Sequence, residues 1–266
     1  MPHGRGYQQT MSDTHNRNYP TTVFLMRHGD IRQDNVRRYI GQADIELNAT
    51  GRAQAISWRT ELANIPLKRI YCSDLCRSHE TACIIAEGRN APVQPLSKLR
   101  EINMGAWDGQ AMDDVRSHYA GEYEKRGADM VYYRPPAGEC FADVAARVIP
   151  LFEEIVRNTT GNLLIVGHAG VNRIILSHIL GMPLDNLFRL RQDYACLNVI
   201  DCGRDGMRLR EMNLDSQVFQ RIISRATEEH GDYSSQGEEQ ATAATTEGRP
   251  DNGRKATIRL QGAVLS

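Results

Sequence analysis

The chain lacks the features that mark membrane proteins, secreted proteins and nucleic-acid-binding proteins. Its 266 residues carry a formal net charge of -1, so there is no basic excess that would favour nucleic acid. No apolar run is long enough to cross a bilayer, and the first twenty residues contain no apolar signal core. We therefore expect a globular protein of the cytoplasm with neither a nucleic-acid partner nor a membrane partner.

The cysteines are few and irregularly spaced. None belongs to a C-x-x-C pair, and no histidines flank them at zinc-finger spacing. Because this pattern is typical of thiols in a reducing compartment, we predict free cysteines rather than disulfides or a metal site. The six residues are Cys72, Cys76, Cys83, Cys140, Cys196 and Cys202.

Apolar residues are missing from a long stretch near the C-terminus. Between Ile223 and Ile258 there is no Val, Ile, Leu, Met, Phe or Trp. Such a stretch cannot bury enough apolar surface to offset the entropy lost on ordering, so we predict that 225–266 is a disordered tail. With 1–20 as a flexible N-terminal segment, one domain is expected over 21–224.

The rest of the chain alternates between strand-like and helix-like segments. Continuous apolar runs such as "NLLIV" are typical of strands buried on both faces, while apolar residues at helical spacing indicate helices. This alternation predicts an α/β fold, a three-layer α/β/α sandwich with a mostly parallel central sheet. Strands are expected at 21–26, 69–72, 162–166, 196–201 and 207–212, and helices at 48–62, 75–87, 110–125, 139–157 and 171–180, with Asn48 as the first helix cap.

Two of the expected parallel strands end in a histidine. The stretch "VFLMRHGD" places Arg27 and His28 after a buried strand, and "NLLIV" is followed by "GHAG", which contains His168 and Ala169. Ligands of open α/β sheets bind beyond the carboxyl ends of the strands, so we expect both imidazoles at one edge. A charged group is costly to bury alone, and the start of the helix that follows "GHAG" offers free N–H groups to an anion. The sequence therefore predicts an anion-binding crevice.

Two further segments carry polar residues whose roles are open when each is taken alone. Arg77 falls in the first turn of a predicted helix, where the helix dipole does not favour a cation unless an anion also binds there. The alternative is a solvated helix arginine. Glu101, in "LREINMGAWDG", precedes a glycine-bounded loop and is by itself only a loop carboxylate.

Taken in order, these motifs resemble the histidine phosphatase superfamily, which also contains cofactor-dependent phosphoglycerate mutase. The resemblance spans about Thr21 to Asn213 and implies a phosphoglycerate mutase-like fold. The loop after Glu101 is more similar to the phosphatase branch, which includes α-ribazole phosphatase-type enzymes. The shared motifs are R-H-G at a strand end, "GQADIELNATGRAQA", S-x-L-x-R-x-x-x-T-A, L-R-E with a following G-x-W-x-G, and G-H-x-G.

The resemblance implies hydrolysis of a phosphomonoester through a phosphohistidine. His28 is then the nucleophile, and a neutral imidazole suits this role at cellular pH. Arg27 and Arg77 clamp the phosphoryl oxygens, and His168 adds a donor as an imidazolium held charged by the phosphate. Glu101 protonates the leaving alkoxide and then activates water. Because the arginines supply the positive charge, we expect no metal and no other cofactor.

Several weaker expectations concern the surroundings of the phosphate. Asn35 is a candidate phosphate contact, although its spacing from the nucleophile is one residue longer than in the mutase pattern. Arg37 or Arg38 is a candidate for a substrate carboxylate or a second phosphate, with surface solvation as the alternative. We expect residues 102–140 to shape the leaving-group side.

Two other functions stay open at this point. A phosphoglycerate mutase must shield its phosphohistidine from water, and the stretch after Glu101 offers little chain for that purpose. A catalytically inactive phosphate-binding module would lack the nucleophile, an arginine or the acid, and all are present. We therefore expect a phosphatase of a small phosphorylated metabolite. The candidates include α-ribazole phosphate, sugar or glycerate phosphates, nucleotides and a phosphohistidine protein, and a homodimer stays open.

Overall fold

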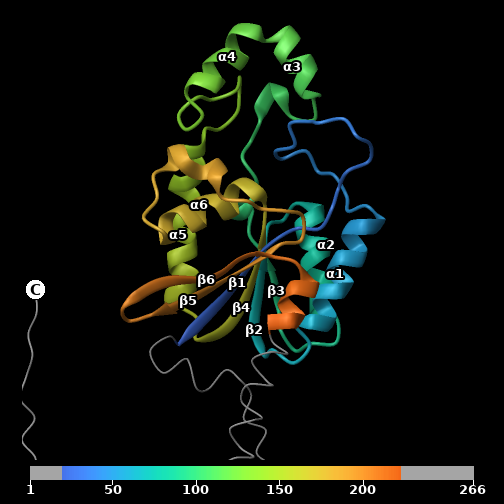
Figure 1. Cartoon of the computed structure of the whole chain (residues 1–266), viewed down its shortest axis with the longest axis vertical. Helices are drawn as coiled ribbons and strands as arrows, with labels where there is room; N and C mark the ends of the chain where they lie inside the picture. Colours follow the sequence, from blue (N-terminus) through green and yellow to red (C-terminus); the bar gives the residue numbers. More distant parts are fainter. Residues whose placement is uncertain (1–19, 223–266) are drawn as a thin grey trace, which may run out of the picture. The chain divides into compact units, whose positions relative to one another are not determined.

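The computed structural model describes residues 20–222, and within this range six strands form one sheet in the order β3-β2-β4-β1-β5-β6 (Figure 1). The strands are β1 (Thr21–Arg27), β2 (Leu67–Cys72), β3 (Val93–Pro95), β4 (Gly161–Gly167), β5 (Leu197–Gly203) and β6 (Gly206–Leu214). The labelled α-helices are α1 (Ala49–Glu61), α2 (Cys76–Ala86), α3 (Met112–His118), α4 (Ala120–Ala128), α5 (Phe141–Arg157) and α6 (Ala169–Ile179), and residues 216–222 are helical as well. Three 3₁₀ helices lie at Ser97–Leu99, Gly105–Trp107 and Leu184–Arg189.

The predictions for the two ends of the chain lie outside the described residues. These are the flexible N-terminal segment, apart from Pro20, and the disordered tail at 225–266. Within the described part of the chain, no helix is both long enough and apolar enough to cross a membrane.

The central strands end level with one another at the carboxyl edge of the sheet. β1 runs parallel to β4 with Arg27 opposite Gly167, and β2 runs parallel to β4 with Cys72 opposite Val166. The residues that follow these strands therefore start from a common edge, where open α/β sheets bind ligands. β5 is antiparallel to both β1 and β6, so the sheet is mixed. The predicted mostly parallel α/β fold is confirmed.

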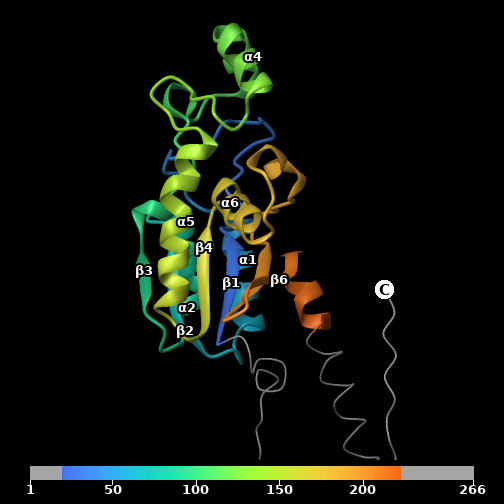
Figure 2. The same ribbon diagram turned by 90° about the vertical axis from the view of Figure 1, so that its left-hand side faces the viewer.

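The hydrophobic core lies in two layers, one on each face of the sheet. Val23 and Leu25 of β1 pack in the layer under α5 and α6, whereas Phe24 and Met26 pack in the layer under α1 and α2. This division follows from the alternation of side chains along a strand. Figures 1 and 2 show the two helix pairs on opposite sides of the strands. The sandwich is thus held by apolar burial on both faces, worth about 1.5–3 kcal/mol for each large side chain.

The single helix predicted over 110–125 is wrong, because the structure breaks it into two. Tyr119 lies between α3 and α4 outside helical conformation, with φ -123° and ψ 42°. The break turns its ring toward Trp107, at 6.2 Å between ring centroids. Trp107 is fully buried and also stacks on Tyr133, so packing around one indole overrides a helical pattern. β3 also escapes sequence prediction, since three residues show no periodicity.

The long connection from β1 to α1 is joined to the segment that leads into α3. Arg38 and Ala111 form a short antiparallel bridge, and the N–H of Met112 donates to the carbonyl of Arg37 at 2.9 Å. Figure 1 shows this connection in blue, with α3 and α4 above it. The two segments together form a wall beyond the carboxyl edge of the sheet.

Helix α1 packs against the start of this connection through two glycines. The predicted cap is confirmed, since the Asn48 side-chain oxygen accepts from the N–H of Gly51 at 2.8 Å. A Cβ on Gly51 would lie 2.3 Å from the carbonyl oxygen of Asp30, and one on Gly29 would lie 2.5 Å from the carbonyl oxygen of Gly51. Both glycines allow the helix to touch the backbone that carries His28.

We expect Gly51→Ala to destabilise the protein by about 1–3 kcal/mol, because the new methyl group overlaps backbone that cannot move alone. The thermal unfolding midpoint should fall, and activity should fall with it as the residues after β1 shift. Gly121→Ala in α4 is the matched control, because nothing lies within 4 Å of a Cβ built there. An equal midpoint for the two variants would contradict the packing described here.

Candidate active site

The two histidines predicted to share an edge lie side by side. His28 follows β1, and His168 follows β4 and precedes α6. Both are buried, and their ring centroids are 5.1 Å apart with 61° between the ring planes. The N–H of His28 donates to the carbonyl of Gly167 at 3.1 Å, which ties the ends of the two strands together. The structure thus brings together two residues that are far apart in the sequence.

The two predicted arginines lie near both histidines, and the space that these four side chains surround is the predicted phosphate hole. Arg77, in the first turn of α2, is 1% exposed and donates from Nη1 to the carbonyl of Ala43 and from Nη2 to that of Gly41, at 2.7 and 2.6 Å. Arg27 donates from Nη1 to the carbonyl of Gln192 at 2.7 Å. In both guanidiniums Nε is buried and has no hydrogen-bond partner. Arg77 is thus a buried cation and Arg27 a half-buried one, and guanidiniums with unsatisfied N–H groups favour a bound anion.

Burial and the neighbouring positive charge both favour the neutral form of the two imidazoles. Burial lowers the pKa of His28 well below 6.5, and the neighbouring Arg27 and Arg77 lower it further. The Nδ1 atom of His28 lies 2.8 Å from the carbonyl oxygen of Gly29, which can only accept, so Nδ1 carries the proton and Nε2 presents a lone pair. A neutral ring with a free Nε2 is the form that a nucleophilic histidine requires.

The expected imidazolium form of His168 depends on a bound phosphate and stays a prediction. Burial lowers its pKa well below 6.5, and Arg77, His28 and Arg27 lower it further. Neither of its ring nitrogens has a hydrogen-bond partner. A protonated His168 would add a third positive charge to a closed site, so only a bound anion can favour it.

Glu101 joins this group through the last glycine of the G-H-x-G motif. Its Oε2 accepts from the N–H of Gly170 at 2.9 Å, and its Oε1 accepts from the N–H of Ile102 at 2.9 Å. A Cβ on Gly170 would lie 2.5 Å from Oε1 of Glu101. The glycine therefore makes room for the carboxyl group, and this contact connects two of the sequence motifs.

Asp108 holds the loop that supports Arg77. Its carboxylate accepts three backbone N–H groups, with Oδ1 bound to Gly41 at 2.8 Å and Oδ2 bound to Gln42 and Ala43 at 2.7 and 2.9 Å. The carbonyls of Gly41 and Ala43 are the two that accept from Arg77. The aspartate of the G-x-W-x-G motif thus reaches the buried guanidinium through one short loop.

Sequence reasoning missed the residues between α6 and β5 that hold Arg27. The ring of Tyr194 lies 3.7 Å from Cζ of Arg27 and 5.7 Å from the His28 ring. Gln192, whose carbonyl accepts from Arg27, is buried, and its side chain exchanges two hydrogen bonds with Asn198 of β5, at 2.9 and 3.0 Å. In the sequence they occur in "LRQDYACLNVI", which has no glycine or histidine to indicate a site.

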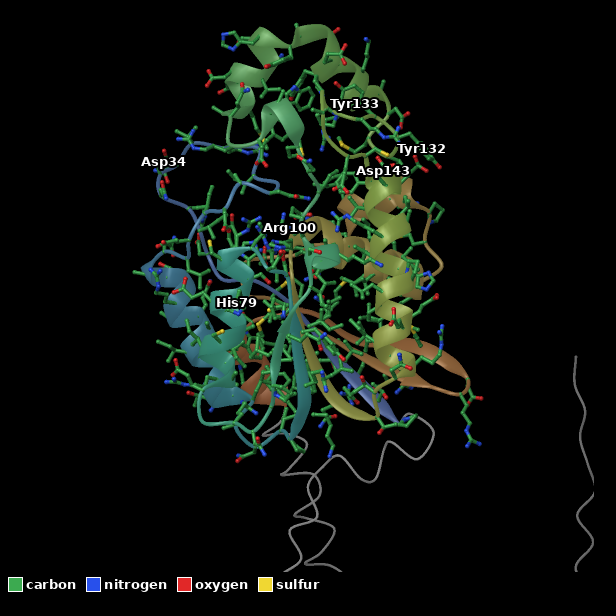
Figure 3. The ribbon with its side chains drawn as sticks, turned by 180° about the vertical axis from the view of Figure 1, so that it is seen from behind. Asp34, His79, Arg100, Tyr132, Tyr133 and Asp143 are labelled. Atoms are coloured by element: carbon green, nitrogen blue, oxygen red, sulfur yellow. The ribbon has the colours of Figure 1, made fainter. Side chains whose placement is uncertain are left out.

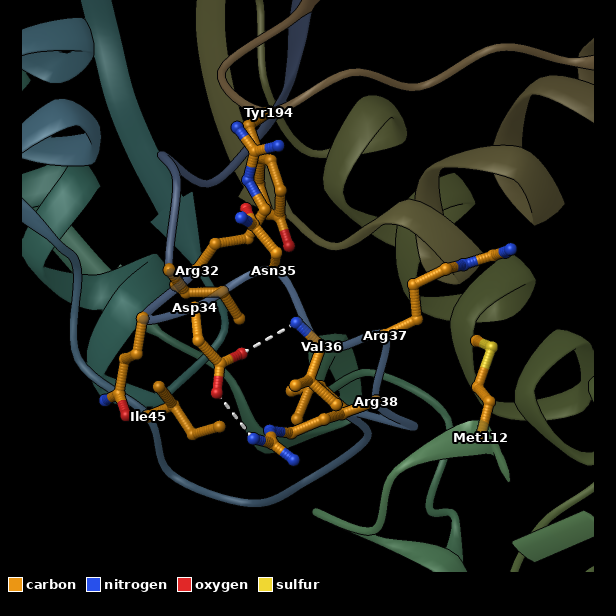
Figure 4. Close-up of a pocket in the computed structure, with 12 residues that line it drawn as sticks. Arg32, Asp34, Asn35, Val36, Arg37, Arg38, Ile45, Met112 and Tyr194 are labelled. Carbon is orange, nitrogen blue, oxygen red and sulfur yellow. Dashed lines mark hydrogen bonds and ion pairs between the residues drawn. The ribbon is translucent and has the colours of Figure 1, made fainter. Parts of the chain in front are cut away.

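A pocket of about 340 Å³ lies beside this centre, and Tyr194 belongs to its wall (Figure 4). Asn35 also lines the pocket and is solvent-exposed, so its predicted phosphate contact stays a prediction. Ala169 is the first residue of α6, next to His168, and its predicted phosphate contact stays a prediction. The other residues of the wall are Ile31, Arg32, Gln33, Asp34, Val36, Arg37, Arg38, Ile40, Ile45 and Met112.

The segment 102–140, which was expected to shape the leaving-group side, contributes only Met112 to this pocket. The ring of Tyr133 packs on Trp107, and its hydroxyl donates to Glu122. Arg134 is paired with Asp143 at 2.6 Å. Figure 3 shows Tyr132, Tyr133 and Asp143 on the same side of the molecule, away from His79 of α2. Tyr133 and Arg134 are thus engaged in packing and an ion pair, whereas the Tyr132 side chain is exposed.

The fold and this closed, positively charged centre define an α/β enzyme built to bind a phosphoryl-like anion. A family model of the histidine phosphatase superfamily (branch 1) matches residues 23–215. The chain belongs to this superfamily and is a histidine phosphatase, which confirms the resemblance seen in its motifs.

Individual relatives agree with this assignment. An adenosylcobalamin/alpha-ribazole phosphatase of Salmonella typhimurium is 30% identical over 192 residues, which cover 72% of this chain and 95% of the relative. A glucosyl-3-phosphoglycerate phosphatase of Mycolicibacterium vanbaalenii is 31% identical over 172 residues, covering 62% and 76%. The crystal structure of the alpha-ribazole phosphatase from Shigella flexneri superposes with a TM-score of 0.69 at 28% identity, covering 73% of this chain and 96% of that one.

We expect the imidazoles of His28 and His168 to titrate well below pH 6.5 in the free protein, because burial and two guanidiniums oppose their protonation. Unfolded histidines take up protons near pH 6.5, so the stability that these two groups contribute is lost as the pH falls below about 6.5. NMR titration of ¹⁵N-labelled imidazoles, assigned with His28→Asn and His168→Asn, measures the midpoints. Midpoints at or above 6.5 would show that the cations do not face the rings.

We expect Asp108→Asn to weaken competitive inhibition by inorganic phosphate and to lower kcat/KM by about tenfold or more, because an amide cannot accept all three N–H groups and Arg77 loses its support. In an Arg77→Ala background the same change should add little, since the aspartate acts through that arginine. Asp113→Asn, at an exposed position in α3, is the control. Full additivity of the two changes would contradict this coupling.

Proposed function

We propose that this enzyme hydrolyses phosphomonoesters of small metabolites through a phosphohistidine on His28. The observation that carries the proposal is the pair of neutral, buried imidazoles 5.1 Å apart with Arg27 and Arg77 against them. His28 presents Nε2 as a nucleophile, and the two guanidiniums together with His168 receive the phosphoryl oxygens. Preorganised positive charge is the main catalytic resource for phosphoryl transfer, because negative charge spreads over these oxygens in the transition state.

The reaction runs in two transfers. In the first, Nε2 of His28 attacks phosphorus, the ester P–O bond breaks, and Glu101 gives its proton to the leaving alkoxide. In the second, water attacks the phosphohistidine, Glu101 takes a proton from this water, and the P–N bond breaks. One phosphomonoester and one water thus yield one alcohol and inorganic phosphate, and both side chains return to their starting forms.

The site supplies its own positive charge, so we expect activity without a metal. Arg27 and Arg77 face the imidazoles, and no group of three or more His, Cys, Asp or Glu residues in the described range has a metal-binding arrangement. The names of the relatives, alpha-ribazole phosphatase and glucosyl-3-phosphoglycerate phosphatase, support a small phosphorylated metabolite as the substrate class.

The location and assembly of the protein complete the proposal. All six cysteines are free thiols, which supports a reducing compartment and therefore the cytoplasm. We place the catalytic domain at 21–224, which contains every residue that takes part in the proposed reaction. A homodimer stays a prediction.

The proposal is tested with p-nitrophenyl phosphate and alkyl phosphates, assayed with and without a chelator. Turnover should survive the chelator, and rapid quenching at neutral to alkaline pH should trap an acid-labile phosphoryl group on His28 that is lost in His28→Ala. Glu101→Gln should slow alkyl phosphates by at least about 10²-fold more than the aryl phosphate, whose leaving group needs no proton.

Two results would contradict the proposal. Labelling that persists in His28→Ala would show that another residue is the nucleophile. Equal decreases in the turnover of aryl and alkyl phosphates by Glu101→Gln would show that Glu101 is not the general acid.

A further inference from the structure

We infer that the pocket beside the phosphate hole receives the leaving group, and that Arg37 makes the enzyme prefer leaving groups with a second anionic group. This inference rests on the proposed function, because it assigns the remainder of a substrate whose phosphoryl group reaches His28. It concerns a carboxylate or a second phosphate, both of which a guanidinium binds through paired N–H groups.

The pocket and the phosphate hole share Tyr194 as a wall. Its ring lies against Arg27 on the side of the hole and also lines the pocket (Figure 4). A volume of about 340 Å³ is at the small end of the range for sites that bind small molecules. A substrate with its phosphoryl group at His28 therefore has room for one small leaving group beside Tyr194.

The arginines of this pocket differ in what neutralises them. Arg32 is bound to the carboxylate of Asp30, and Arg38 is bound to Asp34 at 2.7 Å. Arg37 forms no ion pair and no side-chain hydrogen bond with any residue in 20–222. Figure 4 shows the ion pair of Arg38 as a dashed line and Arg37 extending from the loop without one. The structure thus shows that Arg38 is paired with a carboxylate and Arg37 is not, a difference that the sequence does not indicate.

The backbone of Arg37 is fixed although its side chain is free. Its carbonyl accepts from the N–H of Met112 at 2.9 Å, and the next residue, Arg38, bridges to Ala111. An unpaired guanidinium on an anchored backbone loses less conformational entropy on binding than one on a loose loop. Arg27 and Arg77 already serve the transferred phosphoryl group, so the anion left for Arg37 belongs to the rest of the substrate.

The test uses two pairs of substrates that differ by one anionic group. Glycerol 3-phosphate and 3-phosphoglycerate differ by a carboxylate, and glucose 6-phosphate and glucose 1,6-bisphosphate differ by a phosphate. We expect the native enzyme to show about a tenfold or larger kcat/KM preference for the more anionic member of at least one pair, in line with one charged hydrogen-bonded contact. The pair that shows the preference identifies the kind of anion.

Arg37→Gln should reduce this preference to near unity, mainly through KM. Arg116→Gln is the matched control, since it removes the same charge from an exposed position in α3 outside the pocket wall, and it should retain the native ratio. Equal preference for both members of each pair in the native enzyme would overturn the inference, as would a ratio unchanged by Arg37→Gln. Absence of any turnover, p-nitrophenyl phosphate included, would overturn the proposed function and this inference with it.

Discussion

The constraint on which this structure depends is the burial of positive charge without a negative partner. Arg77 is almost wholly buried, Arg27 turns into the same hole, and both donate to backbone carbonyls rather than to carboxylates. Neutral oxygens orient these cations without neutralising them, and Glu101, Asp44 and Asp108 offset the charge of Arg77 only through attraction without an ion pair. Burial, and after it the same positive charge, lowers the pKa of His28 and of His168. In the proposed reaction a phosphoryl group that binds between these cations relieves this cost, which would give the affinity for substrate and the stabilisation of the transition state one physical origin.

The hole exists because the backbone approaches closely at a few glycines. Gly29 and Gly51 bring α1 against the loop that starts at His28, and Gly170 lets the Glu101 carboxyl group reach the start of α6. In each case a methyl group would overlap backbone or carboxylate atoms. The sequence motifs of this family therefore contain glycines that allow close contact between distant segments, in addition to reactive side chains.

Support for the hole comes from polar groups outside it. The Asp108 carboxylate accepts hydrogen bonds from three N–H groups of the loop that binds Arg77. The backbone carbonyl of Gln192 accepts from Arg27, and the Gln192 side chain is itself hydrogen-bonded to Asn198. Tyr194 separates the phosphate hole from the neighbouring pocket. In the proposed function, selectivity for the leaving group and reactivity toward phosphorus would thus reside in adjoining but different sets of residues.

The sequence by itself determined the α/β class, the positions of most helices and strands, and the meeting of His28 with His168, because parallel strands of equal register end at one edge. It did not determine the break at Tyr119, the place of Tyr194 against Arg27, or which of Arg37 and Arg38 is free. These depend on contacts between segments far apart in the chain, such as the rings around one buried indole and a carboxylate that neutralises one arginine but not its neighbour. Local periodicity reports which way a side chain faces, whereas only the tertiary structure decides what it meets there.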